Sequence, residues 1–228
     1  MSRSRVRVPL SAFFNQNIYY KGGFLKRVLC FGDSNVFGYI PQNGGRYDKN
    51  TRWTGVLQVI SNDKFEIIEA GCNNRTAFSH NPDGIMYTGC EILPQLLSED
   101  LDCVVLAVGI NDLQPFYNTS FADIRSGIEK LIEIVRSKCP CAVIILASPS
   151  VLSEDLLRGN FSCLFDETSI EKSFQMANIY SAAARLKDCE FINFEDIARV
   201  SYLDGLHYDA MAHRKIAEAV FEKLKEVL

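Results

Sequence analysis

The amino-acid sequence predicts an α/β protein of three layers, in which helices cover both faces of a five-stranded parallel sheet. From about residue 26 onward, short apolar runs alternate with segments of helical periodicity, which is typical of parallel sheets. The run at 103–108 is apolar throughout, as expected of a strand that is covered on both faces. At 228 residues, with 47% of them hydrophobic, the chain can bury one substantial core.

Composition narrows the class of protein further. Charged residues make up 23% of the chain and the formal net charge is −4, so nothing favours nucleic acid as a partner. No apolar run approaches the ~18 residues that a membrane helix needs. None of the eight cysteines has zinc-finger spacing, and Cys30 and Cys103 lie inside strand-like runs. We therefore expect no metal, no cofactor and a reducing, cytoplasmic setting.

The strands are predicted from short runs of apolar residues. They are expected at 27–32, 65–70, 103–108, 141–147 and 190–194. The first is the clearest, because the apolar run Val28–Phe31 ends at Gly32 and three turn or cap formers follow it.

The helices are predicted from apolar periodicity and from their caps. They are expected at 51–60, 91–97, 121–137, 168–186 and 210–228. Thr51 is suited to cap the first of them, and Ile124, Ile128 and Leu131 share one face of the third. The remaining segments predict loops, at 38–50, 71–89 and an irregular insertion at 150–166.

Residues 1–24 differ from the rest of the chain. They contain three arginines and no acidic residue, and they show no clean periodicity. Polar residues interrupt the only candidate for the apolar region of a signal peptide. We expect an appended segment outside a catalytic domain at 25–228. An alternative is that synthesis begins near Leu25, because a purine-rich ribosome-binding sequence would encode Lys21-Gly22-Gly23.

Four short polar stretches follow predicted strands. They are Gly32-Asp33-Ser34, residues 71–76, Gly109-Ile110-Asn111-Asp112 and Asp204-Gly205-Leu206-His207. Because the carboxyl ends of parallel strands share one edge of a sheet, and ligands of open α/β sheets bind there, these stretches predict a common site.

The residue types in these stretches are those that acyl transfer requires. Ser34 is the candidate nucleophile, His207 the candidate base, and Asp204 the carboxylate that orients the imidazole. The side chain of Asn111 and the backbone N–H groups of Ser34 and Asn74 are candidates for an oxyanion hole. Candidate substrate-binding residues are Asp33, Arg75, His80 and Tyr87.

Each of these signals also has a structural interpretation. Gly-Asp-Ser is common in turns, Gly109 to Asp112 can cap the helix that follows, and Asp204 to His207 can mark the start of a helix. His80 suits an exposed loop as well as the mouth of a site. His213 is expected on the surface of the last helix, and Trp53 is expected to pack in the core.

The four stretches together resemble the motifs of the GDSL or SGNH hydrolase family. Its first block is similar to Phe31-Gly32-Asp33-Ser34, its third to Gly109-Ile110-Asn111-Asp112 and its fifth to Asp204-Gly205-Leu206-His207. The similarity runs from about residue 26 to the C-terminus. Within the family, Arg52 to Leu57, Glu69-Ala70-Gly71 with Arg75-Thr76, and Asp204 to Tyr208 resemble the arylesterase/acyltransferase branch.

The resemblance implies a flavodoxin-like sheet, metal-free ester hydrolysis and the residue roles given above. One position departs from the family pattern, because the second-block oxyanion residue is usually glycine and the matching residue here is Asn74. The donor is a backbone N–H and asparagine tolerates unusual backbone angles, so Asn74 can still serve. Gly71 is expected to be needed for the turn.

The expected function is hydrolysis of small, acetyl-type esters through an acyl-serine, with transfer to another alcohol left open. Alternatives with the same chemistry are a carbohydrate O-deacetylase and a lysophospholipase or thioesterase. An alternative of another class is a non-catalytic module that binds carbohydrate or lipid. The apolar residues of 156–165 suit a short acyl chain, a lipid or a contact between subunits. We thus expect a small-molecule, carbohydrate or lipid ester as partner, and the sequence leaves a homo-oligomer open.

Overall fold

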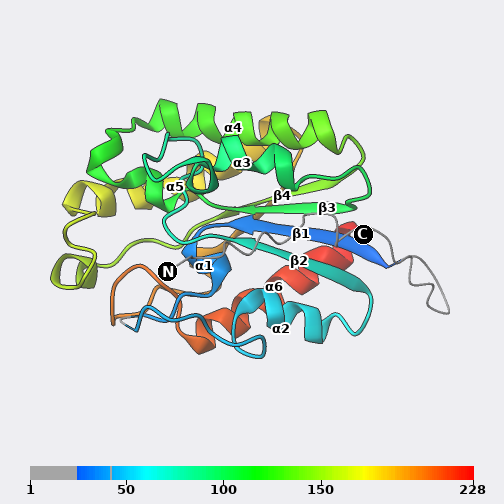
Figure 1. Cartoon of the computed structure of the whole chain (residues 1–228), viewed down its shortest axis with the longest axis horizontal. Coiled ribbons are helices and arrows are strands. Elements are labelled where there is room, and N and C mark those ends of the chain that lie inside the picture. The colour runs from blue at the N-terminus through cyan, green and yellow to red at the C-terminus, as the bar shows by residue number, and fades with distance from the viewer. Residues whose placement is uncertain (1–24, 42) are drawn as a thin grey trace, which may run out of the picture.

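The five strands form one parallel sheet in the order β2-β1-β3-β4-β5 (Figure 1). The computed structural model describes residues 25–41 and 43–228, so the prediction for 1–24 lies outside the described residues. The strands are β1 (Lys26–Gly32), β2 (Phe65–Gly71), β3 (Cys103–Ala107), β4 (Val143–Ser148) and β5 (Glu190–Asn193). The predicted parallel five-stranded sheet is confirmed, although β4 begins two residues later than expected because 139–142 form a turn after the preceding helix.

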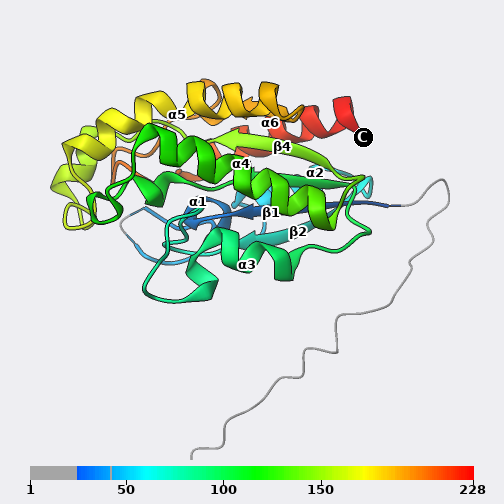
Figure 2. The same ribbon diagram turned by 90° about the horizontal axis from the view of Figure 1, so that it is seen from above.

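Helices cover both faces of this sheet, which gives the three predicted layers. Two helices lie on one face, α2 (Trp53–Ile60) and α6 (Ala210–Val227). Three lie on the other, α3 (Gly89–Leu96), α4 (Phe121–Lys138) and α5 (Glu167–Leu186). Figure 1 shows α3, α4 and α5 above the sheet and α2 and α6 beneath it, and Figure 2 shows α4 and α5 running beside each other.

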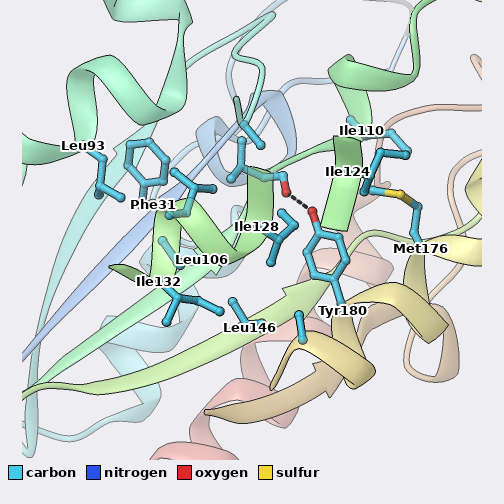
Figure 3. Packing of buried hydrophobic residues seen from close by; sticks show 14 of the residues in the cluster. Phe31, Leu93, Leu106, Ile110, Ile124, Ile128, Ile132, Leu146, Met176 and Tyr180 are labelled. Atoms are coloured by element: carbon cyan, nitrogen blue, oxygen red, sulfur yellow. Dashed lines mark hydrogen bonds between the residues drawn. The ribbon is translucent and has the colours of Figure 1, made fainter. Parts of the chain in front are cut away.

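Alternating side chains of the central strands pack into two separate cores, one on each face of the sheet. In β1, Leu29 and Phe31 join the core beneath α3, α4 and α5, whereas Val28 and Cys30 join the core beneath α2 and α6. Such double burial explains the continuous apolar runs that predicted these strands. In the first core, shown in Figure 3, the Tyr180 hydroxyl of α5 donates to the carbonyl of Val108, directly after β3.

Close backbone packing fixes the chain just after β1. Helix α1 (Ser34–Phe37) begins immediately at the end of the strand, and its backbone lies against Gly71 at the end of β2. A Cβ at Gly71 would stand 2.1 Å from the Phe37 nitrogen, so only glycine fits. Gly71 is therefore required for this close approach and not, as the sequence suggested, for a turn.

Two predictions about individual side chains are wrong. Thr51 does not cap α2: its hydroxyl donates to Asp48, and the cap position is Arg52, which makes no side-chain cap bond. His213 is fully buried rather than on the surface, because it lies on the face of α6 that packs against α2.

His213 is held in its neutral form in the interior. The Trp53 backbone N–H donates to its Nδ1 at 3.2 Å, and Nε2 has no hydrogen-bond partner in the part of the chain that the structure describes. Burial lowers the pKa of His213 to about 3, against the opposing charge of Asp209 and with a further lowering by His207.

Unfolding should therefore become easier on acidification because of His213. Its pKa rises from about 3 in the folded chain to 6.5 when it is exposed, so its stabilising effect is complete above pH 6.5. Below that pH the free energy of unfolding should fall by ~1.4 kcal/mol per pH unit through this proton alone. His213→Asn keeps an acceptor for Trp53 without the titration, and its denaturant unfolding between pH 6.5 and 4.5 should show a shallower pH dependence. Parallel curves for the two proteins would contradict this explanation.

Candidate active site

Ser34 lies at the first turn of α1, at the carboxyl edge of the sheet. Residues Asp33 to Asn35 turn the chain from β1 into the helix because the Asp33 carboxylate accepts the Asn35 backbone N–H at 2.9 Å. Gly38 ends the helix in the left-handed conformation, with φ of 86°. This short turn leaves the Ser34 hydroxyl facing the loop that carries His207.

Ser34, His207 and Asp204 form one hydrogen-bonded series. Ser34 Oγ lies 2.9 Å from His207 Nε2, and His207 Nδ1 lies 2.8 Å from Asp204 Oδ2. A carboxylate only accepts, so Nδ1 carries the proton and Nε2 is free to accept from the serine. The three residues are 4%, 2% and 1% exposed, respectively. The structure thus brings together the three residues that the sequence singled out from opposite ends of the chain.

The loop that carries Asp204 and His207 is closed by its own hydrogen bonds. Asp204 Oδ1 accepts the backbone N–H groups of Leu206 and His207 at 3.1 and 3.0 Å. Burial opposes ionisation of Asp204, but the hydrogen bond and charge of His207 and these backbone donors outweigh it, so its pKa lies below the usual value. Gly205 has φ of 69°, and a Cβ there would meet the Leu156 nitrogen at 2.3 Å.

Asn35 joins the serine helix to the histidine loop. Its side-chain nitrogen donates to the Leu206 carbonyl, and its side-chain oxygen accepts the Tyr208 backbone N–H, both at 3.2 Å. These two bonds lie on either side of His207 along the chain. The register between Ser34 and His207 is therefore fixed by the residue next to the serine. Sequence reasoning treated Asn35 only as a turn former.

The candidate oxyanion residues on two loops are connected through Gln114. Its side-chain nitrogen donates to Asn74 Oδ1 at 3.1 Å and to Asn111 Oδ1 at 3.2 Å. Asn111 in turn donates one N–H to the Arg75 carbonyl at 3.0 Å, which leaves its second N–H for a ligand. Asn74 has φ of 58°, the left-handed region that glycine and asparagine adopt most readily. Gln114 was not identified from the sequence.

The other candidate residues are engaged within the chain. Arg75 is buried, its guanidinium donates to the carbonyls of Gly32, Ala70 and Met86, and it stacks on Phe31. Its guanidinium therefore stabilises the ends of β1 and β2, and its charge is used within the chain. Asp33 is buried at the N-cap of α1, and this burial raises its pKa to about 7. His80 is exposed and pairs with Glu91. Tyr87 is half-buried and ends the 3₁₀ turn Ile85–Tyr87.

Two aromatic rings enclose the imidazole of His207. Tyr39 stacks on it with centroids 4.1 Å apart, and Phe161 meets it edge-on at 5.1 Å. Phe161 belongs to the 150–166 insertion, so this irregular segment covers the site. The sequence showed that the insertion is apolar, but no periodic signal connects Phe161 to Tyr39 or to His207.

Asp112 fixes the long loop after β2. Its buried carboxylate accepts the backbone N–H groups of Ala77, Phe78 and Ser79. Burial raises its pKa in spite of these hydrogen bonds. Asp112 thus holds the loop that carries Asn74, and it directly follows Asn111 in the chain. It belongs to the third motif of the sequence, but there only as a candidate helix cap.

Within residues 25–41 and 43–228, no group of three or more His, Cys, Asp or Glu side chains is arranged to hold a metal ion. In the same residues, no helix combines the length and the apolar character needed to cross a bilayer.

A parallel α/β sheet with a serine, a histidine and an aspartate in series at its carboxyl edge defines a class of ester hydrolases. The model of the GDSL-like lipase/acylhydrolase family matches residues 30–215. The chain belongs to this family and is a carboxylic ester hydrolase. The family predicted from the four sequence stretches is thereby confirmed.

Solved structures of esterases are similar to the chain over nearly its whole length. An aryl esterase from M. smegmatis is 28% identical with a TM-score of 0.81, and the match covers 89% of this chain and 100% of that one. A carbohydrate acetylesterase family member from Sinorhizobium meliloti is 30% identical with a TM-score of 0.82, covering 89% and 99%. Est24, a carbohydrate acetylesterase from the same organism, is 27% identical with a TM-score of 0.81, covering 89% and 100%. A search of curated protein sequences finds no match.

Gln114 should act as a positioning residue for the oxyanion hole. Gln114→Ala and Gln114→Glu both remove the donor that orients Asn111 and Asn74, and kcat for an aryl acetate should fall by ~10-fold. KM should change little, because the oxyanion forms only in the transition state. Steady-state kinetics test this, with the exposed Gln175→Ala as a matched control. Wild-type kcat in both Gln114 variants would rule out the role.

Proposed function

We propose that the chain hydrolyses small, acetyl-type esters through an acyl-serine at Ser34. The observation that carries the proposal is the hydrogen-bonded series from Ser34 Oγ through His207 to Asp204. A serine hydroxyl is inert by itself, and a base in hydrogen-bond reach, held by a carboxylate, is what activates it. The names of the similar structures, an aryl esterase and carbohydrate acetylesterases, support a small acyl group.

The reaction begins at the serine hydroxyl. Ser34 Oγ attacks the carbonyl carbon of the ester while its proton passes to His207 Nε2. Asp204 stabilises the imidazolium that forms, without taking up the proton itself. The negative oxygen of the tetrahedral intermediate accepts hydrogen bonds from the free N–H of the Asn111 side chain and from the backbone N–H groups of Ser34 and Asn74.

Collapse of this intermediate breaks the bond to the alcohol oxygen. His207 gives its proton to the departing alcohol, and an acyl-serine remains. Water then loses a proton to His207 and attacks the acyl-serine, which releases the carboxylic acid and restores Ser34. An alcohol that arrives before water would take the acyl group instead.

A carbohydrate O-deacetylase is the second candidate for the same chemistry. Polar side chains gather beside the oxyanion loops, and these include Asn81, Asp83 and Gln114.

A non-catalytic binding module is disfavoured, because a buried serine–histidine–aspartate series serves no purpose in binding alone. The eight free cysteines support a reducing compartment.

The nucleophile is tested by Ser34→Ala. The substitution should keep the fold, because alanine is the best helix former and the hydroxyl that it removes bonds to the side chain of His207. Enzyme-dependent hydrolysis of p-nitrophenyl acetate should fall by at least ~10³-fold. The exposed Ser137→Ala is the matched control and should retain wild-type turnover. Undiminished hydrolysis by Ser34→Ala would refute the assignment.

The orienting carboxylate is tested separately by Asp204→Asn. An amide in this place donates where His207 Nδ1–H donates, so it favours the wrong tautomer of the imidazole. The expected loss in kcat is ~10⁴-fold, measured with the same ester. A loss of only a few-fold would show that Asp204 serves the fold of its loop and does not support the base.

A further inference from the structure

A cavity of about 430 Å³ adjoins the candidate active site. Its walls come from the loop after β2, from residues 114–117 after β3, and from residues 162–166 of the insertion. Two of these walls connect directly to the site. Asn74 and Gln114, the residues that meet at the oxyanion hole, line it on one side. On the other, the wall begins at Ser162, next to Phe161, which touches His207.

The charges around the cavity are of one sign. Asp83 and Asp166 line it, and no lysine, arginine or histidine does so within the described residues. Asp166 caps α5, where the hydroxyl of Thr168 and the N–H of Ser169 hold its pKa below the usual value against the small effect of burial. Burial raises the pKa of Tyr117 on the same wall, and the charges of Asp112 and Asp83 raise it further. The charged side chains on the wall are therefore both acidic, which favours a negative potential in the cavity.

The side-chain amides on the wall leave acceptors for a ligand. Both N–H groups of Gln114 are engaged by Asn74 and Asn111, so only its carbonyl oxygen remains. Asn81 donates to the Asn74 carbonyl and accepts from the Asp83 backbone N–H. Asp166 uses Oδ1 to cap its helix, and its Oδ2 is a further acceptor. The oxygens of Gln114 and Asp166 are thus acceptors for a group that brings its own donors.

We propose that this cavity holds the non-reacting part of the ester and selects an uncharged, hydroxyl-rich or cationic group over an anionic one. The inference rests on the proposed function, because it concerns the substrate of the same serine. Hydroxyl and ammonium groups donate to these acceptors, and a hydroxyl group can also accept from the hydroxyls of Tyr117 and Ser162 on the same wall. An anionic group would meet two like charges with no cation to offset them. Phe116, 75% exposed at the rim, offers an apolar face to the carbon skeleton of the same group.

The test uses esters of similar size that differ in the charge of one half. For the acyl half these are the 4-nitrophenyl monoester of adipic acid, which is anionic, and its neutral methyl ester. For the alcohol half these are 2-sulfoethyl acetate, neutral 3,3-dimethylbutyl acetate and cationic acetylcholine. The ratio of kcat/KM for the neutral to the anionic ester should exceed ~3 at low ionic strength in at least one pair. A ratio above this in the acyl pair places the acyl half in the cavity, and one in the acetate series places the alcohol half there.

Variants assign this selectivity to the two carboxylates. Asp83→Asn with Asp166→Asn keeps an asparagine cap for α5 and removes both charges. The neutral-to-anionic ratio should fall by ~3- to 10-fold in the double variant, and in the wild type it should shrink as salt rises towards 1 M. Glu99→Gln, which removes an exposed charge at the opposite edge of the sheet, should leave the ratio unchanged.

The proposal is overturned if both pairs give equal rates, if the anionic esters are preferred, or if the double variant keeps the ratio of Glu99→Gln. These results are distinct from a failure of the proposed function. If Ser34→Ala still hydrolysed the neutral esters, the serine mechanism would fail. If Ser34→Ala is inactive and the charge ratio is flat, only the charge selectivity of the cavity fails.

Discussion

The hydrogen bond between Ser34 Oγ and His207 Nε2 is the contact on which the rest of the site depends. It joins residues 173 positions apart, one at the end of the first strand and the other just before the last helix. The parallel sheet makes the contact feasible, because it brings the loops after its strands to a single edge. Asn35 then holds the backbone on both sides of His207, and Asp204 fixes the tautomer of the ring.

The surrounding loops are fixed by three buried polar side chains that are hydrogen-bonded within the chain. Arg75 donates to three backbone carbonyls, and Asp112 accepts from three backbone N–H groups. Gln114 donates to the side chains of two asparagines. Burying such groups is costly unless they are paired, so this network allows few alternative loop arrangements. Rigid placement is what oxyanion stabilisation requires, since donors must already face the developing charge.

Much of this arrangement could be predicted from the sequence, and what was missed has physical reasons. The strands followed from apolar runs that are buried on both faces. Ser34 followed from a motif at the end of the first strand, and Asp204 and His207 followed from a motif in the loop before the last helix. The burial of His213 had a signal, because Ile216, Ala217 and Val220 share its helical face. The contact of Tyr39 and Phe161 with His207 had none, because it arises between irregular segments whose approach only the folded chain defines.

Covalent capture of the nucleophile tests the central contact most directly. A fluorophosphonate reacts with a serine only where a neighbouring base activates it, and peptide mapping by mass spectrometry locates the adduct. The account predicts one adduct, on Ser34, and none on the His207→Ala protein. An adduct on another serine, or equal labelling of Ser34 without His207, would contradict it.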